Sequence, residues 1–147
     1  MEFVNLCGLR FSGRISFGEE GNLNCSYCAC DNWQLSNLDM PMMEFSHCSV
    51  NNMTAVNSKL QQWRFYDCNT SGDLYKTKLF NVNITGGHFN PVMLDCVLSD
   101  TNLGTDPNLP DNNLHGYKSF KKIYQAQGDD VIAQKYFIKK TNLSVVD

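Results

Sequence analysis

The amino-acid sequence predicts an all-β fold of stacked square coils, a β-solenoid, followed by a short helical tail. Three observations predict this fold. A large apolar residue recurs at every fifth position over most of the first hundred residues. A small or β-branched residue stands two positions before many of these large residues. The chain of 147 residues also contains 17 Asn and 10 Gly, residue types that accept the left-handed backbone of turns.

The five-residue period is clearest from residue 72 onwards, where the chain reads GDLYK, TKLFN, VNITG, GHFNP and VMLDC. The middle residues of these units are Leu74, Leu79, Ile84, Phe89 and Leu94. Earlier units centre on Leu6, Phe11, Leu23, Cys28, Trp33, Leu38, Phe45, Val50, Ala55, Leu60, Phe65 and Thr70, and a last unit centres on Leu103. We expect breaks of register near residues 16–20, 41–42, 72 and 98.

A period of five fits neither one face of an α-helix nor the alternation of a half-buried strand. It fits a coil of square cross-section, in which each five residues form one side and its turn. Two residues of each unit then face the interior, and the other three face solvent. Such coils stack at the strand spacing of about 4.8 Å and exchange backbone hydrogen bonds.

Several units share a pattern of a small residue, Asn or Asp, a large apolar residue and two variable positions; they are VNLCG, GNLNC, SNLDM, GDLYK, VNITG and TNLGT. On these units the chain resembles the pentapeptide-repeat family. The resemblance covers about two-thirds of the chain and implies a right-handed quadrilateral β-helix of about five coils. It divides the chain into a β-helix over residues 1–105 and a linker with a C-terminal α-helical hairpin over residues 106–147.

The tail loses the five-residue period after two prolines and acquires helical spacing. Gly128 is expected to end the first helix, and Asp129 or Asp130 to begin the second. Two roles are open for this hairpin: a cap over the open end of the β-helix, or a dimerisation or docking element. We favour the cap, because an uncapped solenoid exposes unpaired backbone. The apolar residues expected to serve either role are Tyr117, Phe120, Tyr124, Ile132, Tyr136 and Phe137.

The seven cysteines carry the most evident candidate chemistry. Cys25 and Cys28 have the C-x-x-C spacing of a zinc site, but no second pair follows at finger spacing. We therefore expect the cysteines to fill the interior, with Cys48 and Cys68 stacked one coil apart. No secretory signal pattern is found, so we predict a cytoplasmic protein with reduced thiols and no metal or cofactor.

The three histidines fall at outward or tail positions, and the sequence contains no glycine-rich phosphate loop. The carboxylate pairs Glu19-Glu20 and Asp129-Asp130 are explained by a loop and by a helix start. A Cys–His nucleophile also needs a third group and a cleft, which a filled solenoid lacks. We therefore predict that the chain is not an enzyme.

The function expected instead is that of a protein-binding module. A net charge of −3 without a basic run argues against direct binding of nucleic acid, and no run approaches the roughly 20 apolar residues that span a membrane. The resemblance implies a DNA mimic that binds a DNA- or RNA-handling enzyme such as gyrase; its acidic contacts would be Asp31, Asp39, Asp67, Asp95 and Asp100. The alternative is an interaction scaffold that uses the helical tail and an aromatic patch of Tyr66, Tyr75 and Phe80. A homodimer through the C-terminal helices is compatible with either.

Overall fold

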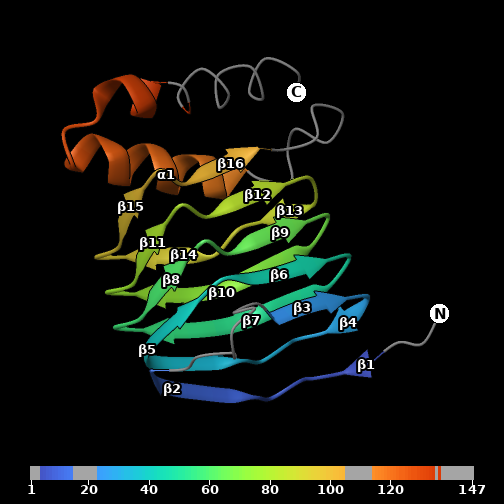
Figure 1. Ribbon diagram of the computed structural model, residues 1–147. Coiled ribbons are helices and arrows are strands. Elements are labelled where there is room, and N and C mark those ends of the chain that lie inside the picture. Colours follow the sequence, from blue (N-terminus) through green and yellow to red (C-terminus); the bar gives the residue numbers. More distant parts are fainter. Residues whose placement is uncertain (1–3, 15–22, 105–113, 135, 137–147) are drawn as a thin grey trace.

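The computed structural model describes residues 4–14, 23–104, 114–134 and 136. Parallel strands stack into a β-solenoid of about four turns, and a helical segment lies over its C-terminal end (Figure 1). The predicted fold class is confirmed, with about four turns in place of the expected five.

The strands form two sheets, and all pairings between the described strands are parallel. The five-stranded sheet contains β3 (Leu23–Ser26), β6 (Met43–Ser46), β9 (Arg64–Tyr66), β12 (Asn83–Thr85) and β16 (Asn102–Gly104). The eleven-stranded sheet contains β1 (Val4–Asn5), β2 (Arg10–Arg14), β4 (Cys28–Ala29), β5 (Gln34–Pro41), β7 (Ser49–Val56), β8 (Lys59–Gln61), β10 (Asn69–Tyr75), β11 (Lys78–Phe80), β13 (His88–Phe89), β14 (Val92–Leu94) and β15 (Val97–Ser99). One regular helix, α1 (Leu114–Ala126), follows, and residues 130–134 are again helical.

Left-handed backbone at the corners of the solenoid accounts for part of the Asn content. Twelve described non-glycine residues have positive φ, and eight of them are Asn or Asp, whose short polar side chains tolerate this conformation. Between Tyr27 and Asp67 these residues recur every five positions, with residue 42 as the exception. The chain therefore turns a corner after each unit of five, and four units complete one turn.

The step from one coil to the next shortens from 20 to 19 residues midway along the solenoid. Phe45 pairs with Phe65, whereas Leu60 pairs with Leu79. The change arises at a register shift between Thr70 and Gly72, which confirms the break expected at residue 72. The other breaks differ from expectation, and residues 16–20 lie outside the described part of the chain.

The register expected for residues 23–40 is wrong by two positions. Cys25 pairs with Phe45 and Leu35 pairs with Ala55, so Cys25 and Leu35 are the middle residues of their units. The expected middle residues Cys28, Trp33 and Leu38 are also buried. Each of them occupies the inward position two residues before the middle of its unit. No break occurs at residues 41–42.

A tryptophan in a position that the repeat pattern gives to small residues is the cause of this error. Trp33 is fully buried, and its ring packs edge-on against Phe45 at a centroid distance of 5.6 Å. Its indole N–H donates to the carbonyl oxygen of Leu6 at 2.8 Å, so its polar atom is satisfied. The interior thus accepts a bulky residue here, which the local pattern does not reveal.

Leu94, expected as a middle residue, is instead 59% exposed. Its neighbour Met93 pairs with Leu74 and packs against the core. Met93 follows Phe89 by four positions and not by the usual five. The same shortening occurs one coil earlier, where Leu74 follows Thr70 by four positions. The break expected near residue 98 therefore lies before Met93.

Aromatic rings run through the interior from the coils to the tail. Phe45 and Phe65 stack at 5.2 Å, Phe65 meets Phe89 at 5.7 Å, and Phe89 meets Phe120 of α1 edge-on at 6.1 Å. Each such pair contributes about 0.5–1.5 kcal/mol beyond the burial of its area. The rings link the tail to the same core as the coils.

One buried hydroxyl interrupts this apolar interior. Thr70 is 2% exposed, and its Oγ1 has no hydrogen-bond partner among the described residues. We expect Thr70→Val to raise the free energy of unfolding by about 1 kcal/mol, because a hydroxyl buried without a partner is removed at constant shape. Urea unfolding monitored by circular dichroism measures the change.

Thr101 supplies the control for this prediction. It is equally buried, but its hydroxyl donates to the carbonyl oxygen of Leu79 at 3.0 Å. Thr101→Val should therefore lower the free energy of unfolding by about 1 kcal/mol. Equal destabilisation by both substitutions would contradict the assignment of Thr70 as unpartnered.

The helical tail packs on the last coil through four of the six residues expected there (Figure 1). Tyr117, Phe120, Tyr124 and Tyr136 are each at most 3% exposed. Ile132 is 40% exposed, and Phe137 lies outside the described residues. None of the described helices is long and apolar enough to cross a membrane.

Polar side chains of the tail form hydrogen bonds with backbone groups of the last coil. A further coil would otherwise pair with these groups. The Gln127 amide donates to the carbonyl oxygen of Leu98 at 2.8 Å and accepts from its N–H at 2.9 Å. The Tyr124 hydroxyl likewise donates to the carbonyl oxygen of Thr101 at 2.8 Å and accepts from its N–H at 3.2 Å. Both side chains thus imitate a neighbouring strand, and the ladder ends without an open edge at these positions.

Candidate protein-interaction surface

Exposed apolar side chains gather on one side of the solenoid. Strands β7, β10 and β14 stack there, and Tyr75 is the register partner of both Val56 and Leu94. These three side chains are 39–59% exposed, and Val92 beside them is 43% exposed. We call Val56, Tyr75, Val92 and Leu94 the apolar ridge. Contiguous exposed apolar residues on a soluble protein commonly mark an interaction site.

A groove with three lysines lies around the next corner from the apolar ridge. Lys59 on β8 and Lys78 on β11 are register partners, and Lys76 is the corner residue between β10 and β11. The groove has a volume of about 280 Å³. Its lining includes Asn37, Asp39, Asn57, Lys59, Lys76 and Lys78, and we call it the basic groove.

Aromatic rings connect the basic groove to the surfaces on either side of it. The Lys76 ammonium group lies 5.3 Å from the centroid of the Tyr75 ring, and that of Lys59 lies 5.1 Å from the Phe80 ring. These distances permit a cation–π attraction. Tyr75 therefore belongs to the apolar ridge and also borders the basic groove.

The three residues of the expected aromatic patch do not lie together. Tyr66 is on β9 in the five-stranded sheet, whereas Tyr75 and Phe80 are on β10 and β11 of the eleven-stranded sheet. Sequence reasoning also missed Val56 and Leu94. The signal that could have found them is their spacing from Tyr75, which equals one 19-residue coil on each side.

The five acidic residues proposed to mimic DNA are spread over the coils. Asp39, on β5 of the eleven-stranded sheet, is the register partner of Lys59. Asp67 directly follows β9, a strand of the five-stranded sheet. Asp31 accepts hydrogen bonds from the Asn51 backbone N–H at 2.8 Å and from the Ser49 hydroxyl. The remaining two, Asp95 and Asp100, are corner residues on either side of β15.

The charges of the described coils nearly balance. Residues 4–14 and 23–104 carry seven acidic and six basic side chains, a net charge of −1. Acidic Glu44 is moreover the register partner of Arg64 on the next coil. Duplex DNA carries one negative charge per about 1.7 Å of its axis. The described coils therefore present no comparable column of negative charge.

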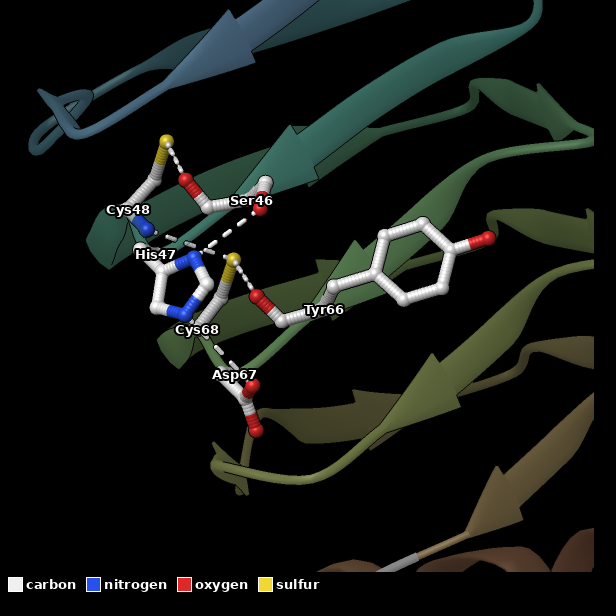
Figure 2. A network of polar contacts seen from close by, with 6 residues as sticks. All are labelled: Ser46, His47, Cys48, Tyr66, Asp67 and Cys68. Carbon is white, nitrogen blue, oxygen red and sulfur yellow. Dashed lines mark hydrogen bonds and ion pairs between the residues drawn. The ribbon is translucent and has the colours of Figure 1, made fainter.

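A polar network surrounds His47 at a corner next to the five-stranded sheet (Figure 2). Its Nδ1 lies 3.0 Å from the Ser46 hydroxyl, and its Nε2 lies 3.6 Å from a carboxylate oxygen of Asp67. The Tyr27 ring stacks on the imidazole at 4.8 Å. The His47 and Asp67 side chains are 46% and 63% exposed, so water reaches the network. A nucleophile needs donors that stabilise developing charge away from water, and we assign no reaction to this network.

Three buried cysteines, Cys28, Cys48 and Cys68, form a column next to this corner, and Figure 2 shows Cys48 and Cys68. The Cys28 N–H donates to Cys48 Sγ, and the Cys48 N–H donates to Cys68 Sγ, both at 3.5 Å, which confirms the stacking expected of Cys48 and Cys68. Burial raises the pKa of Cys28 and raises that of Cys68 to about 11, so both stay protonated at neutral pH. A hydrogen bond from Cys30 lowers the pKa of Cys25 to about 7. Among the described residues, no group of three or more His, Cys, Asp or Glu is placed to hold a metal ion.

Comparison with known proteins adds no further constraint. No family model, curated protein or solved structure matches the chain. The arrangement of the described residues is thus the basis for proposing a function.

Proposed function

We propose that this chain is a non-enzymatic protein-interaction scaffold of the pentapeptide-repeat type, which binds a protein partner through the apolar ridge. The five-residue period and its left-handed corners support the assignment to that family. The observation that carries the function is the alignment of Val56, Tyr75 and Leu94 in one exposed column on three successive coils. Neighbours in such a column lie about 4.8 Å apart, so they offer a continuous contact strip.

The scaffold form of this function is favoured over DNA mimicry. Acidic and basic side chains nearly balance in the described coils, so the coils offer a DNA-binding groove little of the negative charge that duplex DNA carries. The apolar ridge, by contrast, provides the aromatic and aliphatic contacts that are enriched in protein interfaces. A rigid solenoid also loses little conformational entropy when it binds, because its backbone is already ordered.

The test compares two tyrosines with similar exposure on different sheets. We expect Tyr75→Ser to weaken partner binding at least about tenfold, because truncation of a tyrosine that acts as an interface hot spot costs about 2 kcal/mol or more. Tyr66→Ser is the matched control, since Tyr66 is 37% exposed and Tyr75 is 40% exposed. Capture of partners from nuclease-treated cell lysate, quantified against increasing concentrations of tagged protein, measures both effects.

Salt and duplex DNA complete this test. A contact through the apolar ridge should persist as ionic strength rises, because screening acts on charges and not on apolar contacts. Binding that is lost on adding duplex DNA or salt, and that is unaffected by Tyr75→Ser, would replace the scaffold with a DNA mimic. Equal capture by wild type and both variants in all conditions would exclude the apolar ridge as the binding surface.

A further inference from the structure

The basic groove concentrates positive charge on a solenoid whose described coils carry a net charge of −1. Three of the six basic side chains in the described coils line it, and only Asp39 among its lining residues is acidic. Lys59 and Lys78 are stacked directly on adjacent strands. Like charges in this position repel and lower stability. An anion bound between them would reverse that effect.

The lining of the basic groove carries more positive than negative charge, with three lysines against one carboxylate, that of Asp39. Among the described residues, none of Lys59, Lys76 and Lys78 forms an ion pair with a carboxylate. Two of them instead lie over aromatic rings, which restricts their long side chains without consuming their charge. The groove is therefore arranged for a negatively charged group supplied from outside the chain.

We propose that the basic groove binds acidic side chains of an extended segment of the protein partner, whose apolar side chains lie on the apolar ridge. This inference rests on the proposed function and specifies the chemistry of the partner. Tyr75 belongs to the apolar ridge and its ring lies next to Lys76 of the basic groove, so one segment that crosses the corner contacts both surfaces. A free phosphate would fill the groove but leave the ridge uncovered. Only a ligand with acidic and apolar groups uses the whole surface.

The charges around the groove favour a protein segment over a nucleic acid. Asp39 lies inside the groove. Asp73 on β10 is the register partner of Val92 of the apolar ridge, and Asp95 follows Leu94 at the corner. A phosphate backbone carries a charge on every nucleotide. Beyond the lysines, its phosphates would be repelled by these carboxylates. A peptide can place its acidic groups at the lysines alone. The groove volume of about 280 Å³ also suits individual side chains.

The experiment uses a purified full chain and a labelled 12-residue peptide of alternating Glu and Leu, followed by fluorescence anisotropy. A peptide with Gln in place of Glu and a labelled DNA duplex of 12 base pairs serve as comparisons. We expect the acidic peptide to bind at least tenfold more tightly than either. We expect the double variant Lys59→Gln/Lys78→Gln to abolish that preference. The matched control Lys118→Gln/Lys122→Gln changes two exposed lysines of α1 and should leave it intact.

Three results would overturn the proposal: equal binding of the Glu and Gln peptides, tighter binding of the duplex, or equal loss in both lysine variants. Urea unfolding of Lys59→Gln/Lys78→Gln verifies that the fold is retained. Lysate capture with Lys59→Gln/Lys78→Gln distinguishes a failure of the acidic-partner inference from a failure of the scaffold proposal. Partner binding that is lost in Tyr75→Ser but unaffected by the lysine substitutions would overturn the acidic partner and leave the scaffold standing. Binding that is unaffected by either would overturn both.

Discussion

Gly72→Ala is expected to lower the free energy of unfolding by about 3 kcal/mol or more. Gly72 has a φ of 136°, a backbone conformation that residues with a side chain rarely adopt. The backbone strain of alanine in this conformation costs about 1–3 kcal/mol by itself. A Cβ at this position would lie 1.9 Å from the backbone oxygen of Met53 and 2.5 Å from its nitrogen. Relief of that overlap requires the two coils to separate, because the atoms belong to backbone and not to a flexible side chain. Urea unfolding followed by circular dichroism measures the loss.

Gly8→Ala isolates the backbone strain from the overlap between coils. Gly8 has a φ of 79°, and a Cβ there would meet nothing within 4 Å. Its substitution should therefore cost only about 1–2 kcal/mol. A similar cost for both variants would show that the coils can separate at the Gly72 corner without penalty. The shortened coil would then not depend on glycine at that corner.

Phe120→Ala is expected to lower the free energy of unfolding by about 3–5 kcal/mol and to promote association between molecules. Phe120 is fully buried and contacts the rings of Phe89 and Tyr136, so its removal leaves a cavity at the junction of tail and coils. A detached tail would also uncover the backbone groups of Leu98 and Thr101. Unpaired strand edges recruit other strands. Urea unfolding and size-exclusion chromatography measure the two effects.

Lys118→Ala is the control for the tail, since Lys118 is exposed on the same helix. Its substitution should change the free energy of unfolding by less than about 0.5 kcal/mol and leave the elution volume unchanged. If Phe120→Ala behaved like this control, the tail would be a passive appendage. The side-chain pairing by Gln127 and Tyr124 would then add no stability to the last coil.

The tail also bears on the dimer expected from the sequence. The buried residues Tyr117, Phe120, Tyr124 and Tyr136 already contact their own chain, so they cannot form an interface without leaving it. Val131, 86% exposed, and Ile132, 40% exposed, face outwards. A homodimer through the tail therefore remains a prediction that would have to use this outer surface.

The five-residue period was sufficient to predict the solenoid because it is a local property. Each unit must turn one corner, and Asn or Asp at that corner can be read directly, as at Asn52, Asn57 and Asp67. Stacking of Cys48 on Cys68 follows from four such units per turn. The register of residues 23–40 could not be read in the same way. Both inward positions are buried there, and Trp33 occupies the one that the pattern reserves for small residues.

By itself, the sequence determined the repeat, the fold class, the left-handed corners and the helical tail, because each depends on residues close together in the chain. Only the tertiary structure decided which side chains share a surface. One residue lost at the Gly72 corner sets a 19-residue step, which places Val56 beside Tyr75 and Lys59 beside Lys78. A second residue lost before Met93 keeps this step and adds Leu94 to the column of Val56 and Tyr75. Stacking between coils depends on the summed length of all four sides. A change of one residue therefore redirects every outward side chain beyond it, while the local pattern stays the same.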